Sequence, residues 1–495
     1  MTTSTREQVV SAAPSDNRPR LSVLEGGRPL APRERLERLC DQGSLQVIRS
    51  AVVSDAIGAK AEEGDGVVGA AGRIRGRPVF CYAQDSRFRG GSVGVAHADT
   101  IVRVQRLARK AGVPLVAFVE SAGARLQEGV AALNAYARIF AEHVAGSGQA
   151  PQISVITGAA AGGASFSPAL TDFVIMTERA SMFLTEPGVV REVTGEHSSL
   201  RDLGGAQVHE RNGVCQLVVD NDPAAISLVR QLLSYLPQNA CSEAPAEPSR
   251  EPEDPHVERC LPSDPSRPYD VRHVARGLVD AGSLLEICPS WAPNLVTALA
   301  RFDGRPVGVV ASQPSHLGGA LDAEAAQKGA RFVKTCDRLG LPLVVLVDTP
   351  GFLLGSDQEA QGVIRHGATL LRAFAAATVA RVTVVLRTAL GGAYVAMNSK
   401  DLGADLTLAW PGAQIGVMAA EHAVGVIHRA RLADAPPSRR RALADAYASA
   451  HLDAESAARA GHIDEIITPA ETRERVVWAL AALPMHGRRV RDLQR

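Results

Sequence analysis

The chain repeats itself, and this internal similarity constrains its fold more than any other feature of the sequence. The segment GRPVFCYAQDSRFRGGSVG begins at Gly76, and GRPVGVVASQPSHLGGALD begins at Gly304. A second pair, GVPLVAFVESAGARLQEG from Gly112 and GLPLVVLVDTPGFLLGSD from Gly340, has the same separation, since 304 − 76 and 340 − 112 both equal 228. Two similar pairs at one spacing indicate that a domain has been duplicated.

Two further pairs extend the duplication. The segment VITGAAAGGASFSPALTD, residues 155–172, resembles VTVVLRTALGGAYVAMNSKD in the second half, and Gly162 matches Gly391 at nearly the same separation. The segment DQGSLQVI at Asp41 resembles DAGSLLEI at Asp280. Four similar segments in the same order predict two tandem domains of one fold.

A segment that is poor in core-forming residues separates the two copies. Residues 239–268, NACSEAPAEPSREPEDPHVERCLPSDPSRP, are rich in Pro, Glu and Ser. This composition is typical of a surface linker and does not form a packed core. We therefore expect a flexible leader at 1–25, an N-terminal domain at 26–240, a linker at 241–268 and a C-terminal domain at 269–495.

Apolar runs alternate with helical patterns within each copy. The β-branched runs VPLVAFV, ISVIT, LPLVVLV and VTVVL indicate buried strands, and the segments ADTIVRVQRLARKAG and AAQKGARFVKTCDRLG have the periodicity of amphipathic helices. This alternation predicts an α/β fold with largely parallel strands. In such folds, the chemistry usually takes place just beyond the strand ends.

The composition argues against several classes of protein. The 495 residues include 53 basic and 53 acidic side chains, so the net charge gives no indication of nucleic-acid binding. The first twenty residues lack the continuous apolar stretch of a signal peptide or membrane anchor, which favours a cytoplasmic protein without membrane contact. The seven cysteines include no C-x-x-C pair, so we expect no metal site and mostly buried thiols.

In each copy an apolar strand ends in a small-residue loop, TGAAAGGAS after Ile156 and TALGGAY after Leu386. Glycine permits close approach of the backbone to a ligand, and a helix that begins there directs unpaired N–H groups at that ligand. We expect Pro168 to lie in the first turn of the first helix. A tight strand-to-helix turn is the alternative interpretation, but two corresponding loops favour a pair of oxyanion holes.

Other candidate residues carry weaker signals. Arg87 and Arg89 have the charge to bind the phosphates of a ligand, with solvated surface arginines as the alternative. Glu120 and Asp348 occupy corresponding strand ends, where we expect structural ion pairs in place of acid–base catalysis. A structural role is also expected for the histidines, which show neither a triad context nor an H-x-x-x-H spacing: His97, His197, His209 and His366.

Together these segments resemble the carboxyltransferase, or β, subunits of biotin-dependent acyl-CoA carboxylases. The matching segments extend from LAPRERLERLCDQGS at Leu30 to VGVIHR at Val424, and they include FRGGSVG, SAGARLQEGV, AGGASFSPALTDFVIM, VDTPGFLLGSDQE and GGAYVAMNSKDLGAD. The pattern is closer to the propionyl-CoA/acetyl-CoA type than to the methylcrotonyl-CoA type.

The resemblance implies two tandem, duplicated crotonase-like (ClpP/crotonase) domains and a homohexamer built as a ring of dimers. Each active site would join the N-terminal half of one subunit to the C-terminal half of another. In family terms, the amides of Gly162 and Gly163, with Ala164 as an optional third donor, would hold the acyl-CoA thioester oxygen. The amides of Gly392 and Ala393 would hold the ureido oxygen of carboxybiotin. The remaining substrate-binding candidates are Arg87, Ala122, Gly123 and Val395.

The resemblance also implies a reaction and a partner. Carboxybiotin would release carbon dioxide, the biotinyl anion would take the α-proton of acetyl-CoA or propionyl-CoA, and the enolate would attack to give malonyl-CoA or methylmalonyl-CoA. The protein would supply mainly position and electrostatics. The sequence contains no Met-Lys-Met attachment pattern and no ATP-binding carboxylase region, so a biotinylated α subunit is expected to carry the biotin.

Two other functions stay open at this point. A decarboxylase of a malonyl-type thioester, with or without biotin, would need the same two holes because it forms the same enolate. A subunit that only supports an assembly would keep the fold without turnover.

The sequence departs from the family pattern at four places. Glu120-Ser-Ala-Gly-Ala-Arg125 stands where the family usually reads D-S-G-G-A-R, which places a methyl group at Ala122. Ser312 replaces a usual Asn, and Leu354 replaces a usual Pro. Val395 stands where propionyl-preferring relatives often carry Asp and broader ones an apolar residue.

Overall fold

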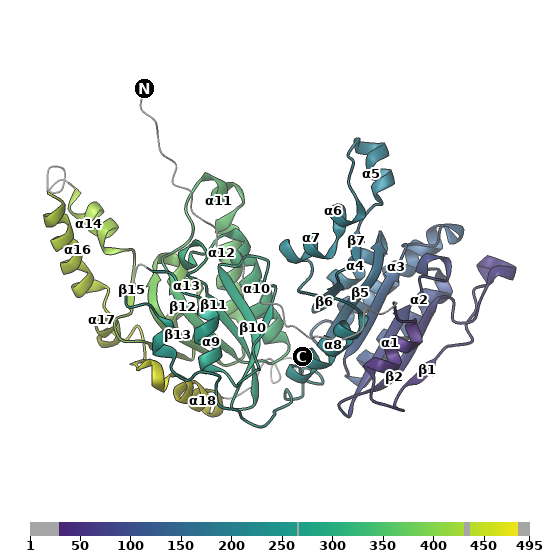
Figure 1. Ribbon diagram of the computed structural model, residues 1–495, viewed down its shortest axis with the longest axis horizontal. Coiled ribbons are helices and arrows are strands. Elements are labelled where there is room, and N and C mark those ends of the chain that lie inside the picture. Colours follow the sequence, from purple (N-terminus) through teal and green to yellow (C-terminus); the bar gives the residue numbers. More distant parts are fainter. Residues whose placement is uncertain (1–28, 265–266, 430–435, 484–495) are drawn as a thin grey trace.

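The two halves of the chain form two separate sheets of eight strands each (Figure 1). The structure, a computed structural model, describes residues 29–264, 267–429 and 436–483, so the expected leader at 1–25 lies outside the described residues. The first sheet has the order β1-β2-β3-β4-β5-β6-β8, and β7 pairs with β5. Its strands are β1 (Gln46–Ile48), β2 (Val67–Ile74), β3 (Arg77–Gln84), β4 (Leu115–Ser121), β5 (Gln152–Ala161), β6 (Phe173–Thr177), β7 (Ser181–Phe183) and β8 (Leu217–Val219).

The second sheet repeats the first strand by strand. Its order is β16-β14-β13-β12-β11-β10-β9, and β15 pairs with β13 as β7 does with β5. In both sheets the first three strands are antiparallel and the others are parallel. Its strands are β9 (Leu285–Ile287), β10 (Leu295–Phe302), β11 (Arg305–Ser312), β12 (Leu343–Thr349), β13 (Arg381–Leu390), β14 (Leu406–Ala409), β15 (Gln414–Gly416) and β16 (Glu465–Ile466).

Even the irregularities of the two sheets correspond. The β4–β5 register shifts between Val119 and Ser121, and the β12–β13 register shifts between Val347 and Thr349, which are the equivalent positions of the second copy. Both shifts precede the ends of the central strands. The predicted duplicated α/β fold with largely parallel strands is therefore confirmed.

Helices cover both faces of each sheet. In the first half α1 and α8 pack together on one face, and α2 and α3 pack together on the other. In the second half α9 and α18 take the places of α1 and α8, and α10 and α12 take the places of α2 and α3. The two helices predicted from periodicity are present as α2 and α10. The N-terminal helices are α1 (Pro32–Leu39), α2 (Val95–Ala111), α3 (Val130–Gly146), α4 (Gly163–Ala169), α5 (Pro187–Thr194), α6 (Leu200–Gly204), α7 (Ala206–Arg211) and α8 (Asp222–Tyr235). The C-terminal helices are α9 (Val271–Leu278), α10 (Ala323–Arg338), α11 (Ser356–Ala360), α12 (Val363–Ala376), α13 (Gly391–Ala396), α14 (Ala420–Ile427), α16 (Pro437–His451), α17 (Ala454–Arg459) and α18 (Thr472–Ala482).

The segment after α8 follows the surface of the C-terminal half. It has no helix or strand until the short turn at Val257–Cys260. Glu247 N–H donates to Gly304 O at 3.0 Å, and Arg301 donates to Pro245 O at 2.8 Å. A side chain on Gly304 would collide with the Glu247 carbonyl, so this segment lies directly on the β10–β11 hairpin. The division of the chain at residues 240 and 268 stays a prediction.

Polar contacts join the two halves at the C-terminal end of α8. The Tyr235 hydroxyl donates to Ser283 O at 2.7 Å, and Arg301 donates to Ser234 O at 2.7 Å. The last carbonyls of a helix have no intrahelical donor, and a guanidinium there also complements the helix dipole. One apolar cluster continues across this junction from α8 to α12, so the halves share a core.

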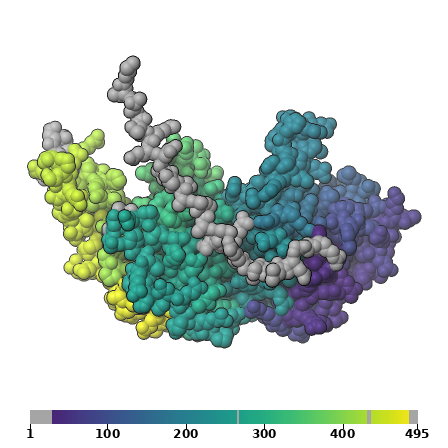
Figure 2. All heavy atoms as spheres, viewed as in Figure 1, coloured from purple at the N-terminus to yellow at the C-terminus, as the bar shows by residue number. Residues whose placement is uncertain are grey.

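Two pairs of helices project from the lobes that the halves form. Figure 2 shows α5 and α6 standing above the N-terminal lobe, and α14 with α16 at the far end of the C-terminal lobe. Each projection follows the strand that lies beside a glycine loop, β7 in the first half and β15 in the second. No helix in the described ranges has both the length and the apolar character needed to cross a membrane.

Candidate active site

The first glycine loop connects β5 to α4. Gly162 has φ 56° and ψ −124°, a backbone conformation that strains any residue with a side chain. Gly163 and Ala164 stand at the first two positions of α4, where a helix supplies no carbonyl acceptor for their N–H groups. Ser165 N–H donates back to Gly162 O at 3.0 Å, so it is the first amide of the helix that is satisfied locally.

The Gly162 amide is already used within the fold. It donates to Phe183 O at 2.9 Å, which continues the pairing of β5 with β7. The donors that this loop offers to a ligand are therefore the amides of Gly163 and Ala164. This narrows the set of Gly162, Gly163 and Ala164 that the resemblance implies.

Two contacts hold this loop from behind. A methyl group on Gly163 would lie 2.9 Å from the Tyr136 ring, so only glycine fits between α4 and α3 here. A methyl group on Gly123, whose φ is 97°, would lie 3.0 Å from Ala161 O. The two predicted site residues thus lie together: Gly163 packs on Tyr136, and Gly123 packs on Ala161 at the end of β5.

The second glycine loop connects β13 to α13. Gly391 has φ 60°, and a methyl group there would lie 3.2 Å from Val417 O. Gly392 is exposed, and a methyl group on it would lie 3.7 Å from Phe352, an ordinary van der Waals distance. Gly392 and Ala393 are early in α13, in the places that Gly163 and Ala164 take in α4. The packing behind Gly392 is therefore looser than that behind Gly163.

The expectation for Pro168 is wrong. This residue is the sixth of the seven residues of α4 and lies inside the helix, not in its first turn. Proline removes the hydrogen bond that its amide would give to the carbonyl four residues earlier. The loss is small because the helix ends one residue later, at Ala169.

Glu120 and Asp348 form ion pairs, as predicted. Glu120 accepts from Arg35 at 3.0 Å and from the Ser86 hydroxyl at 2.7 Å. Asp348 accepts from Arg387 at 3.0 Å and from the Tyr269 hydroxyl at 2.8 Å. Burial raises the pKa of Asp348, and the Arg387 charge opposes this shift. Both carboxylates support strand ends from within the protein.

The other predicted residues lie at different distances from this chemistry. Ala122 is exposed beside Gly90, whose carbonyl accepts from Ala122 N–H at 2.8 Å. Arg87 is exposed and forms a two-pronged ion pair with Asp85 at 2.8 and 2.7 Å, which leaves its predicted phosphate contact untested. Val395 is 40% exposed on α13, two residues after Ala393.

The structural role predicted for the histidines is confirmed for His97 and His209, and most thiols are buried as predicted; His197 is exposed and His366 contacts the adjacent Arg365, so for these two the role stays a prediction. His97 is fully buried, with one ring nitrogen 2.9 Å from Asp65 O and the other 3.1 Å from Gln84. His209 contacts Met182 O at 2.5 Å. Five of the seven cysteines are buried. The described residues contain no group of three His, Cys, Asp or Glu side chains placed to hold a metal.

Sequence reasoning missed Tyr136 and Phe352, which back the two loops. Tyr136 lies on α3 and is 4% exposed, so in the sequence it looks like any core position of a helix. Phe352 lies in the segment TPGFLL, which resembles the family, but the resemblance gives no separate role to the Phe352 ring. Neither residue had a spacing signal that related it to a glycine loop.

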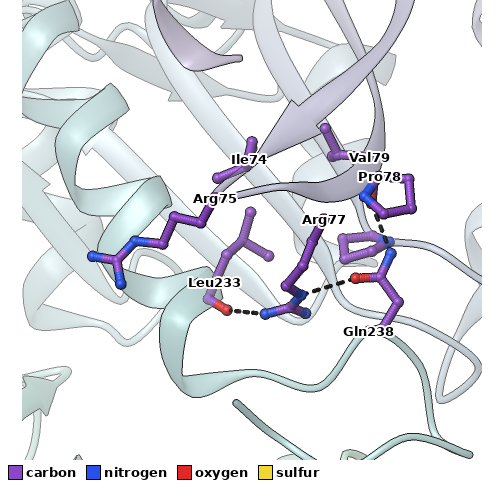
Figure 3. A pocket seen from close by; sticks show the side chains of 8 residues that line it. Ile74, Arg75, Arg77, Pro78, Val79, Leu233 and Gln238 are labelled. Carbon is purple, nitrogen blue, oxygen red and sulfur yellow. Dashed lines mark hydrogen bonds between the residues drawn. The ribbon is translucent and has the colours of Figure 1, made fainter. Parts of the chain in front are cut away.

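The pocket in Figure 3 lies near the C-terminal end of α8 and belongs to neither loop. Its arginine is satisfied by the protein, since Arg77 donates to Leu233 O at 2.9 Å and to Gln238 at 3.0 Å. The neighbouring Arg75 forms an ion pair with Glu247 at 2.9 Å. These contacts stabilise the junction of the halves and give the pocket no free group for chemistry.

Comparisons with known proteins identify the family of the chain. Residues 23–493 match the family model of the carboxyl transferase domain. The chain is 44% identical over 476 residues to the biotin-dependent acetyl-/propionyl-coenzyme A carboxylase β5 subunit of Mycobacterium tuberculosis, with 92% of this chain and 87% of that protein covered. It is 43% identical to the methylmalonyl-CoA decarboxylase subunit α of Veillonella parvula, with 92% and 90% covered.

A solved structure extends the agreement to the fold. The transcarboxylase 12S structure, described as a hexamer assembly and determined with methylmalonyl-coenzyme A and methylmalonic acid bound, has a TM-score of 0.88 and 43% identity to this chain. The match covers 92% of this chain and 89% of that one. The expected tandem crotonase-like fold is therefore confirmed, and the chain belongs to the carboxyl transferase family of enzymes.

Proposed function

We propose that the chain transfers a carboxylate from carboxybiotin to the α-carbon of acetyl-CoA or propionyl-CoA, giving malonyl-CoA or methylmalonyl-CoA. The observation that carries this proposal is the pair of corresponding loops, each with amides placed to bind a developing oxyanion. Gly163 and Ala164 provide them in the first half, and Gly392 and Ala393 in the second. Donors of this kind contribute about 2.7–4 kcal/mol each to transition states that develop negative oxygen.

In this proposal the first loop binds the acyl-CoA. The amides of Gly163 and Ala164 donate to the thioester oxygen as negative charge forms on it. Ala122, Gly123 and Arg87 are the further acyl-CoA contacts; Arg87 is exposed and paired with Asp85. The donor set fits an anionic oxygen, because backbone N–H groups at a helix start carry partial positive charge.

The second loop binds the ureido oxygen of carboxybiotin through Gly392 and Ala393. Carboxybiotin, carried by a biotinylated α subunit, supplies the carboxylate and the base for the α-proton. The exposed surface at Gly392 supports this role, because a group on a partner must reach the loop from outside. The chain's own residues orient the two reactants and need not supply a nucleophile.

The two loops belong to different halves of one chain, so we propose that each site forms between two copies. Large apolar side chains are exposed around both loops, and such patches mark interaction surfaces. Beside the first loop these are Leu126, Val130, Leu133, Phe166 and Leu184. Beside the second they are Leu354, Ile364, Val417, Met418 and Val426. By resemblance to the family, we propose that these dimers assemble into a homohexamer. The cytoplasmic location stays a prediction.

The acyl preference is proposed to depend on Val395. Its side chain is 40% exposed on α13, and in the site proposed between two copies this exposed face lies opposite the first loop, where the acyl group is held. Replacing Val395 with Asp should move the ratio of kcat/KM values from acetyl-CoA toward propionyl-CoA. Equal ratios in the two proteins would remove Val395 from the specificity determinants.

The function is tested by incubating the oligomer with a purified carboxybiotin carrier protein and a panel of acyl-CoA esters. We expect a carboxylated product from short-chain esters and none when the carrier is omitted or lacks carboxylate. Turnover of a thioester in the absence of any biotin protein would contradict the carboxylase proposal.

A decarboxylase of a malonyl-type thioester is the second candidate, favoured by the 43% identity to the Veillonella parvula subunit. The same amides would stabilise the same enolate. Loss of carboxylate from methylmalonyl-CoA that exceeds transfer under matched conditions would favour this candidate. An intact oligomer without turnover in either direction would favour the role of an assembly subunit.

A further inference from the structure

Tyr136 lies directly behind the first glycine loop. Its ring is the surface that a methyl group on Gly163 would meet at 2.9 Å, and its side chain is 4% exposed. The ring also packs 5.7 Å, between centroids, from Phe140, which contacts Phe166 of α4 edge-on at 6.3 Å. The aromatic residues of α3 therefore form the surface on which α4 begins.

The Tyr136 hydroxyl extends this contact to a second segment. It shares a hydrogen bond of 3.3 Å with the Ser121 hydroxyl, which is 1% exposed. The Ser121 hydroxyl in turn accepts from Gly123 N–H at 3.1 Å. Gly123 lies against Ala161 O, one residue before Gly162. Tyr136 thus contacts the loop directly at Gly163 and indirectly, through Ser121 and Gly123, at Ala161.

We propose that Tyr136 is a positioning residue that fixes the amides of Gly163 and Ala164 through its ring and through the Tyr136–Ser121–Gly123 hydrogen bonds. This inference rests on the function proposed above for the first loop. A displacement of about 1 Å in a catalytic arrangement costs as much as about 100-fold in rate, so a rigid support behind the donors has kinetic value. Tyr136 itself touches no reactant in this account.

The second half lacks this support, although it keeps part of the arrangement. Thr349 corresponds to Ser121 and accepts from Gly351 N–H at 3.4 Å, as Ser121 does from Gly123. The buried positions of α12 have the same spacing as those of α3, and by this spacing Tyr136 corresponds to Gly367, where a methyl group would lie 3.1 Å from Phe352. The tyrosine is therefore specific to the first loop and is not simply a consequence of the duplicated fold.

The test is Tyr136→Phe, which keeps the ring and removes the hydroxyl. Its matched control is Tyr235→Phe, since Tyr235 is also buried and its hydroxyl donates to Ser283 O, at the junction of the halves. We expect hydrogen exchange in peptides covering residues 120–125 and 157–170 to rise about five- to tenfold in Tyr136→Phe only, as for the loss of one buried hydrogen bond. The exchange measurement needs no substrate, so it stays informative if the proposed reaction fails.

In the carboxyl-transfer assay, Tyr136→Phe should lower kcat about tenfold, with KM for acyl-CoA within about twofold of wild type. Ser121→Ala should have a similar effect, and the double variant should be little worse than either, because the two hydroxyls act as a unit. Unchanged exchange in Tyr136→Phe, an equal rise in Tyr235→Phe, or a change in KM alone would overturn the positioning role.

Discussion

The two glycine loops have the same backbone design and different surroundings. Gly162 and Gly391 have φ angles of 56° and 60° at equivalent strand ends. Behind the first loop, the Tyr136 ring leaves no room for a methyl group on Gly163, whereas Phe352 leaves ordinary contact space behind Gly392. Duplication therefore preserved the positions of the amides, while the packing that fixes them diverged. Under the proposed roles, the tighter loop holds the small thioester oxygen and the looser loop receives a group from a partner.

The largest expected effect is a difference between two equivalent alanine substitutions. Gly163→Ala should lower kcat at least about 100-fold, because its methyl group forces α4 away from Tyr136 and displaces oxyanion donors. Gly392→Ala should lower kcat less than about threefold, since 3.7 Å to Phe352 is normal contact. The kcat of carboxyl transfer, measured for both variants, tests this difference. Similar losses of kcat in the two variants would show that the difference in packing does not affect catalysis.

The two halves should also differ in their response to acid. Burial lowers the pKa of His97 to about 3 from 6.5, so between these pH values the unfolded state binds a proton that the folded state does not. Stability is therefore lost as the pH falls below about 6.5, by up to about 1.4 kcal/mol per pH unit. Burial also lowers the pKa of His143, to about 4, in the N-terminal half, and in the C-terminal half partial burial lowers the pKa of His316, so the effect is larger in the N-terminal half.

Thermal unfolding at pH 7.5 and pH 5.5 measures this difference. The drop in midpoint between the two pH values should be smaller in His97→Gln than in wild type. The exposed His462 provides the control, and His462→Gln should keep the wild-type drop. An undiminished drop in His97→Gln would show that other groups cause the acid sensitivity.

The smallest expected difference is between Gly162→Ala and Gly391→Ala. Both positions have positive φ, so each substitution should destabilise the protein by about 1–2 kcal/mol. Gly391→Ala should be slightly worse, because its methyl group would lie 3.2 Å from Val417 O, against 3.8 Å from Leu184 O for Gly162. Unfolding midpoints at neutral pH provide the comparison. A large destabilisation by one variant alone would contradict the equivalence of the two loops.

The sequence predicted what depends on repetition and on local pattern. The constant separation of the segments at Gly76 and Gly304 and of those at Gly112 and Gly340 predicted two sheets of one design. The apolar runs placed the strands on each side of the loops. The ion pairs of Glu120 and Asp348 also followed from their equivalent positions. These features are local in sequence or repeated, so a single chain displays them.

Contacts across long separations could not be predicted. Tyr136 lies on α3 and Gly163 on α4, with the whole of β5 between them, and nothing in the helical pattern of α3 indicates which buried position faces the loop. The Gly162 amide was expected to bind the ligand, but it donates to Phe183 O at the end of β7. Pro168 was expected in the first turn because proline is common at helix starts, but it lies near the end of the seven-residue helix α4.

The central claim is that one site uses the first loop of one subunit and the second loop of another. Complementation tests it most directly: Gly163→Val and Gly392→Trp oligomers, each expected to be inactive, are dissociated, mixed and reassembled, and carboxyl transfer is measured. In a mixed two-fold dimer one site combines two intact loops, so random mixing should restore about a quarter of wild-type activity. Mixed oligomers that form but stay inactive would contradict the account.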